Sequence, residues 1–248
     1  MSSLNKILVT GDVGYIGSVL TAMLRDKSYD VRGYDTGYYE DCLLYPVNLD
    51  YPRITQDIRD LCTEDLSGID AIIHLAGLSN DPLGELAPGI TEEINLAATI
   101  KLAKAARSAG VKRFIYASSQ SMYGVSNTAS ELDEDDSEKN PVTSYAVTKW
   151  EAELQLKALI NEDFTVVCFR PSTVFGASPR LRCDIVFNNL VACALQQAAS
   201  KSRVTVRRGG RWCMCVTYAM LSLPGWKRRP RSWADVHTMW VFQTEILQ

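Results

Sequence analysis

The chain has 248 residues, 46% of them hydrophobic and 22% charged, so it can bury one large core and has the composition of a soluble globular protein. It shows no secretory signal and no apolar run near the roughly 20 residues that span a membrane, which predicts a cytoplasmic protein without a membrane role. Seven cysteines without zinc-binding spacing are expected to be reduced, mostly buried thiols, and no metal site is expected.

The net charge of −3 is unevenly distributed. From Arg207 onward, seven Lys and Arg residues face two acidic residues, which gives this tail a net charge of +5 and leaves −8 on the first 206 residues. A basic tail can bind nucleic acid. This tail shows neither helical nor strand periodicity, however, so we expect no nucleic-acid partner.

Short β-rich runs alternate with longer helical segments along most of the chain. The pattern predicts strands at residues 6–10, 29–34, 53–56, 71–75, 113–117 and 165–170, and helices at 15–25, 90–109 and 144–161. Such alternation is typical of an α/β protein with a doubly wound parallel (Rossmann) sheet and helices on both faces. The acidic stretch 131–139 is interpreted as a solvated loop rather than a metal site.

A glycine-rich stretch, TGDVGYIG at residues 10–17, lies between the first strand and the first helix. Gly11 allows a tight turn, Gly14 lets the backbone approach a pyrophosphate, and Gly17 lets the helix pack closely on the sheet. Asp35 ends the second predicted strand, where a carboxylate accepts hydrogen bonds from the ribose 2′-OH of NAD and repels the 2′-phosphate of NADP. Because no arginine directly follows Asp35, the sequence favours NAD.

Serine, tyrosine and lysine residues between positions 118 and 149 predict redox chemistry. Ser118 and Ser119 follow the strand RFIYA directly, and Tyr145 and Lys149 form a YxxxK one helical turn apart. A free tyrosine has a pKa near ~10, which a lysine ammonium and a nicotinamide cation would lower. A serine hydroxyl can bridge the tyrosine and a substrate hydroxyl. The set predicts proton removal coupled to hydride transfer to NAD.

Taken together, the motifs resemble the extended short-chain dehydrogenase/reductase family, the NAD-dependent epimerase/dehydratase group that acts on nucleotide sugars. The resemblance covers roughly residues 5–206. The matching segments are TGDVGYIG, YD at Asp35, DIRD at 57–60, HLAG at 74–77, NLAAT from Asn95, SSQSMYG from Ser118, NPVTSYAVTK around Tyr145, and RPSTVFG from Arg170.

The resemblance implies roles for individual residues. Ser119, Tyr145 and Lys149 would be catalytic, and Ser119, Thr173 and Asn189 would contact the substrate, whereas His74 would be a packed strand residue. Residues at the glycine turn, the strand ends and the catalytic segment would bind the cofactor: Gly11, Gly14, Tyr15, Ile16, Gly17, Asp35, Asp57, Ile58, Leu75, Ala76, Gly77, Ser118, Tyr145, Lys149 and Pro171.

The reaction implied by the resemblance is narrower than the family's range. Dehydratases of the family carry an Asp-Glu pair where this chain has Gln120 and Ser121, so 4-epimerisation or simple oxidoreduction of a nucleotide sugar is favoured. The family also implies a homodimer formed through the helices at 90–109 and 144–161. Two alternatives stay open: a catalytically silent NAD-binding remnant, and an NAD(P)-dependent reductase of a small carbonyl compound.

We expect three regions: an NAD-binding Rossmann domain with the catalytic residues at 1–180, the start of a substrate-binding lobe at 181–206, and an aberrant tail at 207–248. The family's VHVRD and YNVG segments, part of a substrate lobe, do not appear in the tail. A shift of reading frame would force Val-Gly from Met-Trp-Val at 239–241 and Val from Trp-Cys at 212–213 and Met-Cys at 214–215. The tail is therefore hypothesised to be a frameshifted translation.

Overall fold

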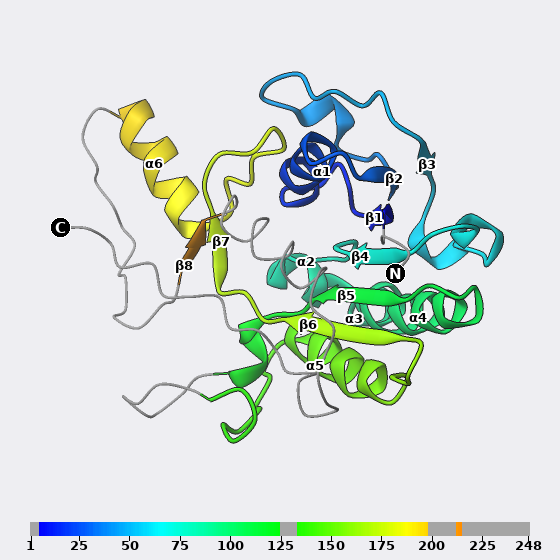
Figure 1. The fold of residues 1–248 in the computed structure, drawn as a ribbon. Helices are drawn as coiled ribbons and strands as arrows, with labels where there is room; N and C mark the ends of the chain where they lie inside the picture. The colour runs from blue at the N-terminus through cyan, green and yellow to red at the C-terminus, as the bar shows by residue number, and fades with distance from the viewer. Residues whose placement is uncertain (1–4, 125–132, 198–211, 215–248) are drawn as a thin grey trace.

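A single parallel sheet of six strands organises the computed structural model, which describes residues 5–124, 133–197 and 212–214 (Figure 1). Its order, β3-β2-β1-β4-β5-β6, is that of the Rossmann fold, which confirms the predicted doubly wound sheet. The strands are β1 (Lys6–Thr10), β2 (Asp30–Asp35), β3 (Arg53–Thr55), β4 (Ala71–His74), β5 (Arg113–Ala117) and β6 (Thr165–Phe169).

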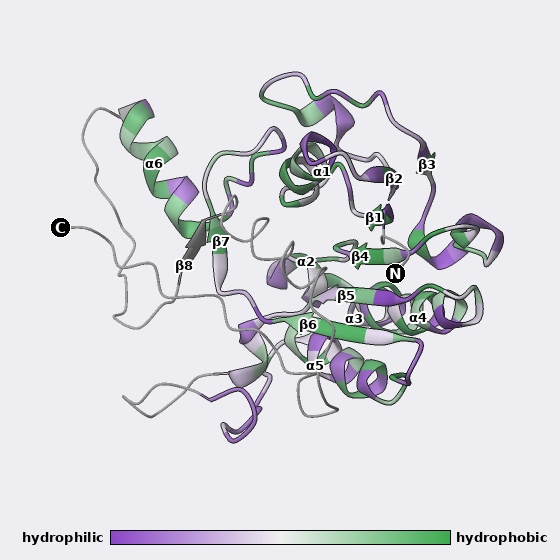
Figure 2. Cartoon of the chain, in the orientation of Figure 1, coloured by the Kyte–Doolittle hydropathy of each residue, from purple (hydrophilic) through white to green (hydrophobic). Residues whose placement is uncertain are grey.

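The sheet is apolar on both faces because successive strand residues alternate between two cores. Leu8 and Phe114 face one core, which α4 (Ala98–Ser108) and α5 (Ser144–Lys157) cover with residues such as Ala103. Ile7 and Val9 face the other core, which α1 (Gly17–Asp26) covers. Figure 2 shows the central strands as predominantly hydrophobic. Covered faces leave the carboxyl ends of the strands as the edge that can hold a ligand.

The predicted helix at 90–109 is confirmed as a continuous helical run, but it is not a regular α-helix throughout. The chain forms α3 (Pro88–Glu92), a π-helical turn η4 (Glu93–Ala97) and then α4. A short helix that the sequence did not predict, α2 (Asp81–Leu86), precedes them, and the side chain of Asn80 caps it by accepting a hydrogen bond of 3.0 Å from the N–H of Leu83. The sequence did not predict α2 or the start of α3 because prolines and glycines, which occur between residues 82 and 89, usually mark loops.

The remaining elements are short or peripheral. Helical turns occur at η1 (Glu40–Cys42), η2 (Ile58–Asp60), η3 (Glu64–Leu66) and η5 (Gln120–Tyr123). A second, two-stranded parallel sheet consists of β7 (Thr173–Phe175) and β8 (Trp212–Met214), and α6 (Val186–Gln197) lies between these strands in the chain. The backbone of β8 is the described part of the predicted aberrant tail; the rest of 207–248 lies outside the described residues.

Two expectations about side chains meet different outcomes. The five cysteines whose side chains the structure describes are free, but among them only Cys168 is buried, so the expectation of mostly buried thiols is wrong for these residues: the others lie on η1, in loops or on α6. Asp133 closes a turn in the acidic stretch by accepting hydrogen bonds from the N–H groups of Asp135 and Asp136, as a solvated loop would. Within the described ranges, no helix could cross a membrane and no cluster of His, Cys, Asp and Glu could hold a metal ion.

Candidate active site

The glycine turn joins β1 to α1 where the strand order reverses, between β1 and β4. Gly11 has a φ of +76°, and a Cβ there would lie 2.8 Å from the backbone nitrogen of Ala76. A Cβ on Gly17 would overlap the carbonyl oxygen of Gly11, so α1 packs against the turn as closely as backbone permits. The N-cap residue of α1, Ile16, has no polar side chain to occupy the first N–H groups of the helix. The turn therefore fits a dinucleotide pyrophosphate.

Two acidic residues predicted to bind the cofactor follow the glycine turn in the chain: Asp35 ends β2, and Asp57 precedes η2. The Asp35 carboxylate accepts hydrogen bonds from the N–H groups of Gly37, at 2.9 Å, and Val13. Burial raises the pKa of Asp35 most, and the charge of Asp12 adds to this, while the two backbone bonds oppose it. Asp57 is paired with Arg59 at 2.8 Å, and the hydrogen bonds from that side chain lower the pKa of Asp57. Asp35 keeps acceptor capacity for a ribose hydroxyl, whereas the Asp57 carboxylate is already engaged.

The three predicted catalytic residues lie together at the carboxyl end of β5. Lys149 is buried and its Nζ donates a hydrogen bond of 2.8 Å to the carbonyl oxygen of Ala117. Ser119 Oγ accepts a hydrogen bond of 3.2 Å from the N–H of Ser121 and is also hydrogen-bonded to the side chain of Tyr145. The buried Ser118 Oγ has no partner among the described residues. A serine–tyrosine–lysine arrangement of this kind can position a hydroxyl and move its proton.

The protonation of this group differs from the expectation. Burial raises the pKa of Tyr145, and the hydrogen bond with Ser119 only partly opposes that rise. The predicted lowering by Lys149 is not found, because the Lys149 ammonium is directed to the Ala117 carbonyl and lies 5.8 Å from the centre of the Tyr145 ring. Burial lowers the pKa of Lys149 to about 8, although the charge of Glu153 works in the other direction. The residues around Tyr145 thus hold it protonated in the protein alone.

Comparison with known proteins assigns the family. The family model described as "NAD dependent epimerase/dehydratase family" matches residues 7–212. The chain belongs to this family. It is 33% identical over 214 residues, 77% of this chain and 63% of the relative, to the "Uncharacterized UDP-glucose epimerase YtcB" of Bacillus subtilis. It is 32% identical over 193 residues, 71% of this chain and 48% of the relative, to a 3β-hydroxysteroid dehydrogenase/Δ5→4-isomerase of Mycobacterium tuberculosis.

A solved structure described as "MoeE5 in complex with UDP-glucose and NAD" has a TM-score of 0.76 to this chain at 26% identity, covering 92% of this chain and 73% of that chain. The family is NAD-dependent, and its relatives and structural neighbours are enzymes. The chain spans roughly half to two thirds of the length of the curated relatives it matches, 63% of the first and 48% of the second.

One residue that the family comparison places in the matched region was not predicted as a site residue. Asn95 is buried in the π-helical turn, and its side-chain amide bonds both backbone groups of Leu78, accepting at 2.8 Å and donating at 2.9 Å. A Cβ on Gly77 would lie 2.8 Å from Asn95 Oδ1 and 3.9 Å from Lys149 Nζ. Asn95 therefore holds the segment after β4 close to Lys149. The sequence signal for Asn95 was its place at the start of the NLAAT segment.

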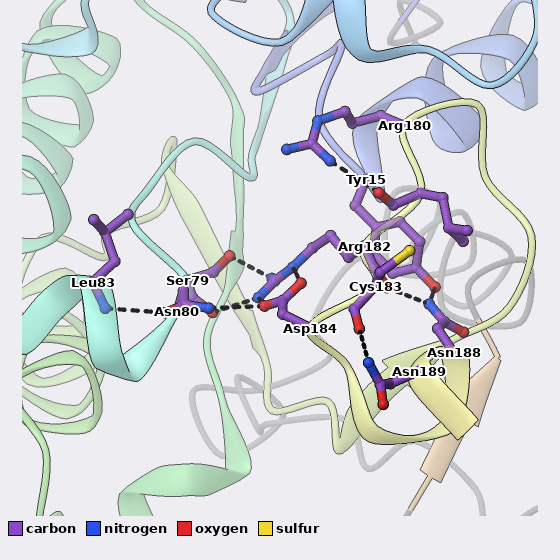
Figure 3. A network of polar contacts seen from close by, with 11 residues as sticks. Tyr15, Ser79, Asn80, Leu83, Arg180, Arg182, Cys183, Asp184, Asn188 and Asn189 are labelled. Carbon is purple, nitrogen blue, oxygen red and sulfur yellow. Dashed lines mark hydrogen bonds and ion pairs between the residues drawn. The ribbon is translucent and has the colours of Figure 1, made fainter. Parts of the chain in front are cut away.

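A second unpredicted group ties the loop after β4 to the segment before α6 (Figure 3). Arg182 donates to Ser79 Oγ at 2.7 Å and pairs with Asp184 at 2.6 Å, while Asn80 donates to the same Asp184 carboxylate at 2.8 Å. Charges on Asp81 and Arg182 also act on the pKa of Tyr145, in opposite directions. The network therefore borders Tyr145, and the sequence predicted no site role for its residues.

Two of the predicted substrate residues are exposed on separate elements. Thr173 is exposed on β7, and Asn189 is exposed on α6, where it donates to the carbonyl oxygen of Cys183 at 3.0 Å. The neighbouring Asn188 is buried instead and donates to the hydroxyl of Tyr15 at 3.1 Å. The carbonyl oxygen of Pro171 accepts from the N–H of Gln120 at 3.1 Å.

His74 is a packed residue, as predicted. It is 1% exposed, and its ring nitrogens lie 2.6 Å from Thr10 Oγ1 and 2.8 Å from Thr99 Oγ1. Burial, with a smaller effect of the Lys149 charge, lowers the pKa of His74 to about 3, which keeps the imidazole neutral.

Proposed function

We propose that this chain carries out NAD-dependent oxidoreduction at a hydroxyl-bearing carbon of a nucleotide sugar, with Tyr145 as the base and 4-epimerisation as the overall reaction. The observation that carries the proposal is the convergence of Ser119, Tyr145 and Lys149 at the carboxyl end of β5, beside the Gly77 segment. The similarity to a UDP-glucose epimerase and to a UDP-glucose complex supports the substrate class.

The residues divide the work as follows. The glycine turn would hold the pyrophosphate of NAD, and Asp35 would bind the adenosine ribose. Residues 75–77 would line the cofactor backbone. NAD, when bound, supplies the hydride acceptor. Ser119 would orient the substrate hydroxyl, Tyr145 would take its proton, and Lys149 would support the phenolate electrostatically.

Dehydration is disfavoured by the residues next to Ser119. Gln120 and Ser121 stand where an acid–base pair would be needed for elimination, and the Ser121 hydroxyl lies 2.7 Å from Ser119 Oγ. Neither side chain ionises near neutral pH, so neither supplies the general acid or base of an elimination.

The test is an assay of the full chain with NAD and UDP-glucose, UDP-N-acetylglucosamine, UDP-glucuronic acid and dTDP-glucose, with products identified by NMR. Epimerised sugar without net NADH would support the proposal. Net NADH would favour a dehydrogenase, a candidate that the similarity to a hydroxysteroid dehydrogenase supports. NAD binding without turnover of any sugar would indicate a catalytically silent NAD-binding protein. Reduction of a small aldehyde or ketone would indicate a carbonyl reductase.

We also propose that the chain forms a homodimer through α3, α4 and α5. Leu86, Ile90 and Leu154 are exposed on or beside these helices, and a hollow of about 530 Å³ on α4 and α5 is lined by Leu96, Ala97, Ile100, Lys101, Lys104 and Gln155. Light scattering should give twice the chain mass, and Leu154→Lys should halve it. A monomeric wild-type chain would refute the dimer.

A further inference from the structure

A buried ion network lies beneath the glycine turn. The Asp12 carboxylate, inside the turn, is fully buried, and its Oδ2 accepts hydrogen bonds from the Tyr51 hydroxyl at 2.7 Å and from Arg53 Nε at 2.9 Å. Arg53 Nη2 donates to Glu40 Oε1 at 2.8 Å. The Arg53 guanidinium is thus held between two carboxylates, one from each side.

The register of the sheet places this network beside the residue expected to bind the adenosine ribose. Arg53 on β3 pairs with Gly33 on β2, two residues before Asp35, so Gly33 and Asp35 lie on the same face of that strand, about 7 Å apart. A Cβ on Gly33 would overlap the Asp12 carboxylate, which therefore occupies the space over Gly33. The charge of Asp12 also acts on Asp35.

Glu40 contacts the Arg53 guanidinium at Nη2, whereas Asp12 contacts it at Nε. Glu40 Oε1 lies 3.1 Å from where a Cβ on Gly37 would be, and the Gly37 N–H is bonded to Asp35. Asp12, Asp35 and Glu40 thus surround Arg53 at the carboxyl end of β2. A guanidinium is the side chain best suited to bind a phosphate in a bidentate fashion, but here Nε and Nη2 are both engaged.

We propose that Arg53 is a masked phosphate-binding residue, and that Asp12 and Glu40, by engaging it, help Asp35 to set the preference for NAD over NADP. The inference rests on the cofactor site proposed above. A 2′-phosphate placed at Asp35 would bring nearly two negative charges to three carboxylates and one already paired cation. Neutral side chains at positions 12 and 40 would remove two of these charges and free the guanidinium for the phosphate.

The experiment compares dissociation constants of NADH and NADPH, measured by fluorescence titration of the full chain. Asp12→Asn with Glu40→Gln should tighten NADPH binding about tenfold or more, the effect of one charge-assisted contact, and change NADH binding much less. Adding Arg53→Met should abolish the gain. Asp41→Asn is the matched control, because it removes an adjacent charge while both ion pairs of Arg53 remain. Glu40→Gln alone, at a partly exposed position, should give a smaller gain that Arg53→Met also abolishes, even if the double variant does not fold.

Each remaining outcome overturns the inference. Unchanged NADPH binding, with NADH still bound, would show that the carboxylates do not mask Arg53. A gain that survives Arg53→Met would assign the phosphate to another cation, such as Arg180, which lies 4.0 Å over the Tyr39 ring. A wild-type chain that binds neither cofactor would remove the proposed function and this inference together, whereas the first two outcomes leave the proposed function intact.

Discussion

Lys149 Nζ donates a hydrogen bond of 2.8 Å to the carbonyl oxygen of Ala117, the last residue of β5. This bond ties α5 to the strand end that leads into Ser118 and Ser119. The same ammonium lies 4.6 Å from the centre of the Tyr116 ring, on a neighbouring position of that strand. The lysine is therefore as much a link between helix and sheet as a charge beside Tyr145.

The lowered pKa of Lys149 makes stability depend on pH. The unfolded side chain titrates near 10.5 and the folded one at about 8, so between these values the unfolded state binds more protons and stability rises with pH. Relative to Lys149→Met, the wild-type chain should gain about 3 kcal/mol across this window. Urea unfolding of both proteins over that pH range measures the difference, and parallel curves would contradict it.

Tyr145→Phe should abolish proton transfer while leaving the ring in place. If Tyr145 is the base, turnover should fall by about 10²- to 10⁴-fold, with the dissociation constant for NADH nearly unchanged. Tyr45→Phe, which removes the hydroxyl of an exposed tyrosine, is the control and should retain full activity. Activity retained in Tyr145→Phe would mean that another group moves the proton.

The fold, and the proximity of Ser119, Tyr145 and Lys149, could be predicted because local patterns determine them. Buried strands of a parallel sheet are short apolar runs, and the turns that bind phosphate need glycine, so β1, Gly11 and Gly17 are visible in the sequence. The YxxxK spacing likewise follows from helix periodicity. Boundaries moved by one to four residues, as α5 did, because helix ends depend on caps and on packing.

The features that could not be predicted from the sequence depend on contacts between segments that are distant in the chain. Asn95 on η4 meets Leu78, which follows β4, only in the assembled fold, and Asp12 meets Arg53 only through the β2–β3 register. The pKa direction of Tyr145 was missed for the same reason: burial, a property of the assembled fold, outweighs the neighbours along the helix.

Asn95→Leu should damage the site through the loop after β4. Its loss leaves the N–H and C=O of Leu78 without their amide partner, at a cost of about 1–3 kcal/mol for each group that stays buried. We expect lower stability in urea and weaker NADH binding, because the 77–78 segment is no longer fixed. Asn161→Ala removes a turn cap on the exposed chain before β6, and should lower stability slightly without changing NADH binding. Equal NADH affinity in Asn95→Leu would show that this loop does not contact the cofactor.

We propose that the segment from Arg207 onward is read in a shifted frame. The family match ends at residue 212, and the shifted codons of 239–241 must encode Val-Gly, as in the family's YNVG segment. Sequencing the gene should reveal VHVRD and YNVG in one alternative frame. A gene whose alternative frames encode neither segment would refute the frameshift.

Gly17→Ala tests whether the glycine turn holds the cofactor pyrophosphate. The new Cβ would overlap the carbonyl oxygen of Gly11, so the turn and the start of α1 must separate, and we expect NADH binding to weaken by at least about tenfold. Gly89→Ala is the matched control: nothing lies within 4 Å of its added Cβ, and alanine in α3 should stabilise the protein by about 0.5 kcal/mol without affecting NADH. Titration and thermal unfolding of both variants separate a binding effect from a loss of fold. Unchanged NADH affinity in a folded Gly17→Ala protein would place the pyrophosphate elsewhere, because close approach of helix and turn is what the third glycine provides.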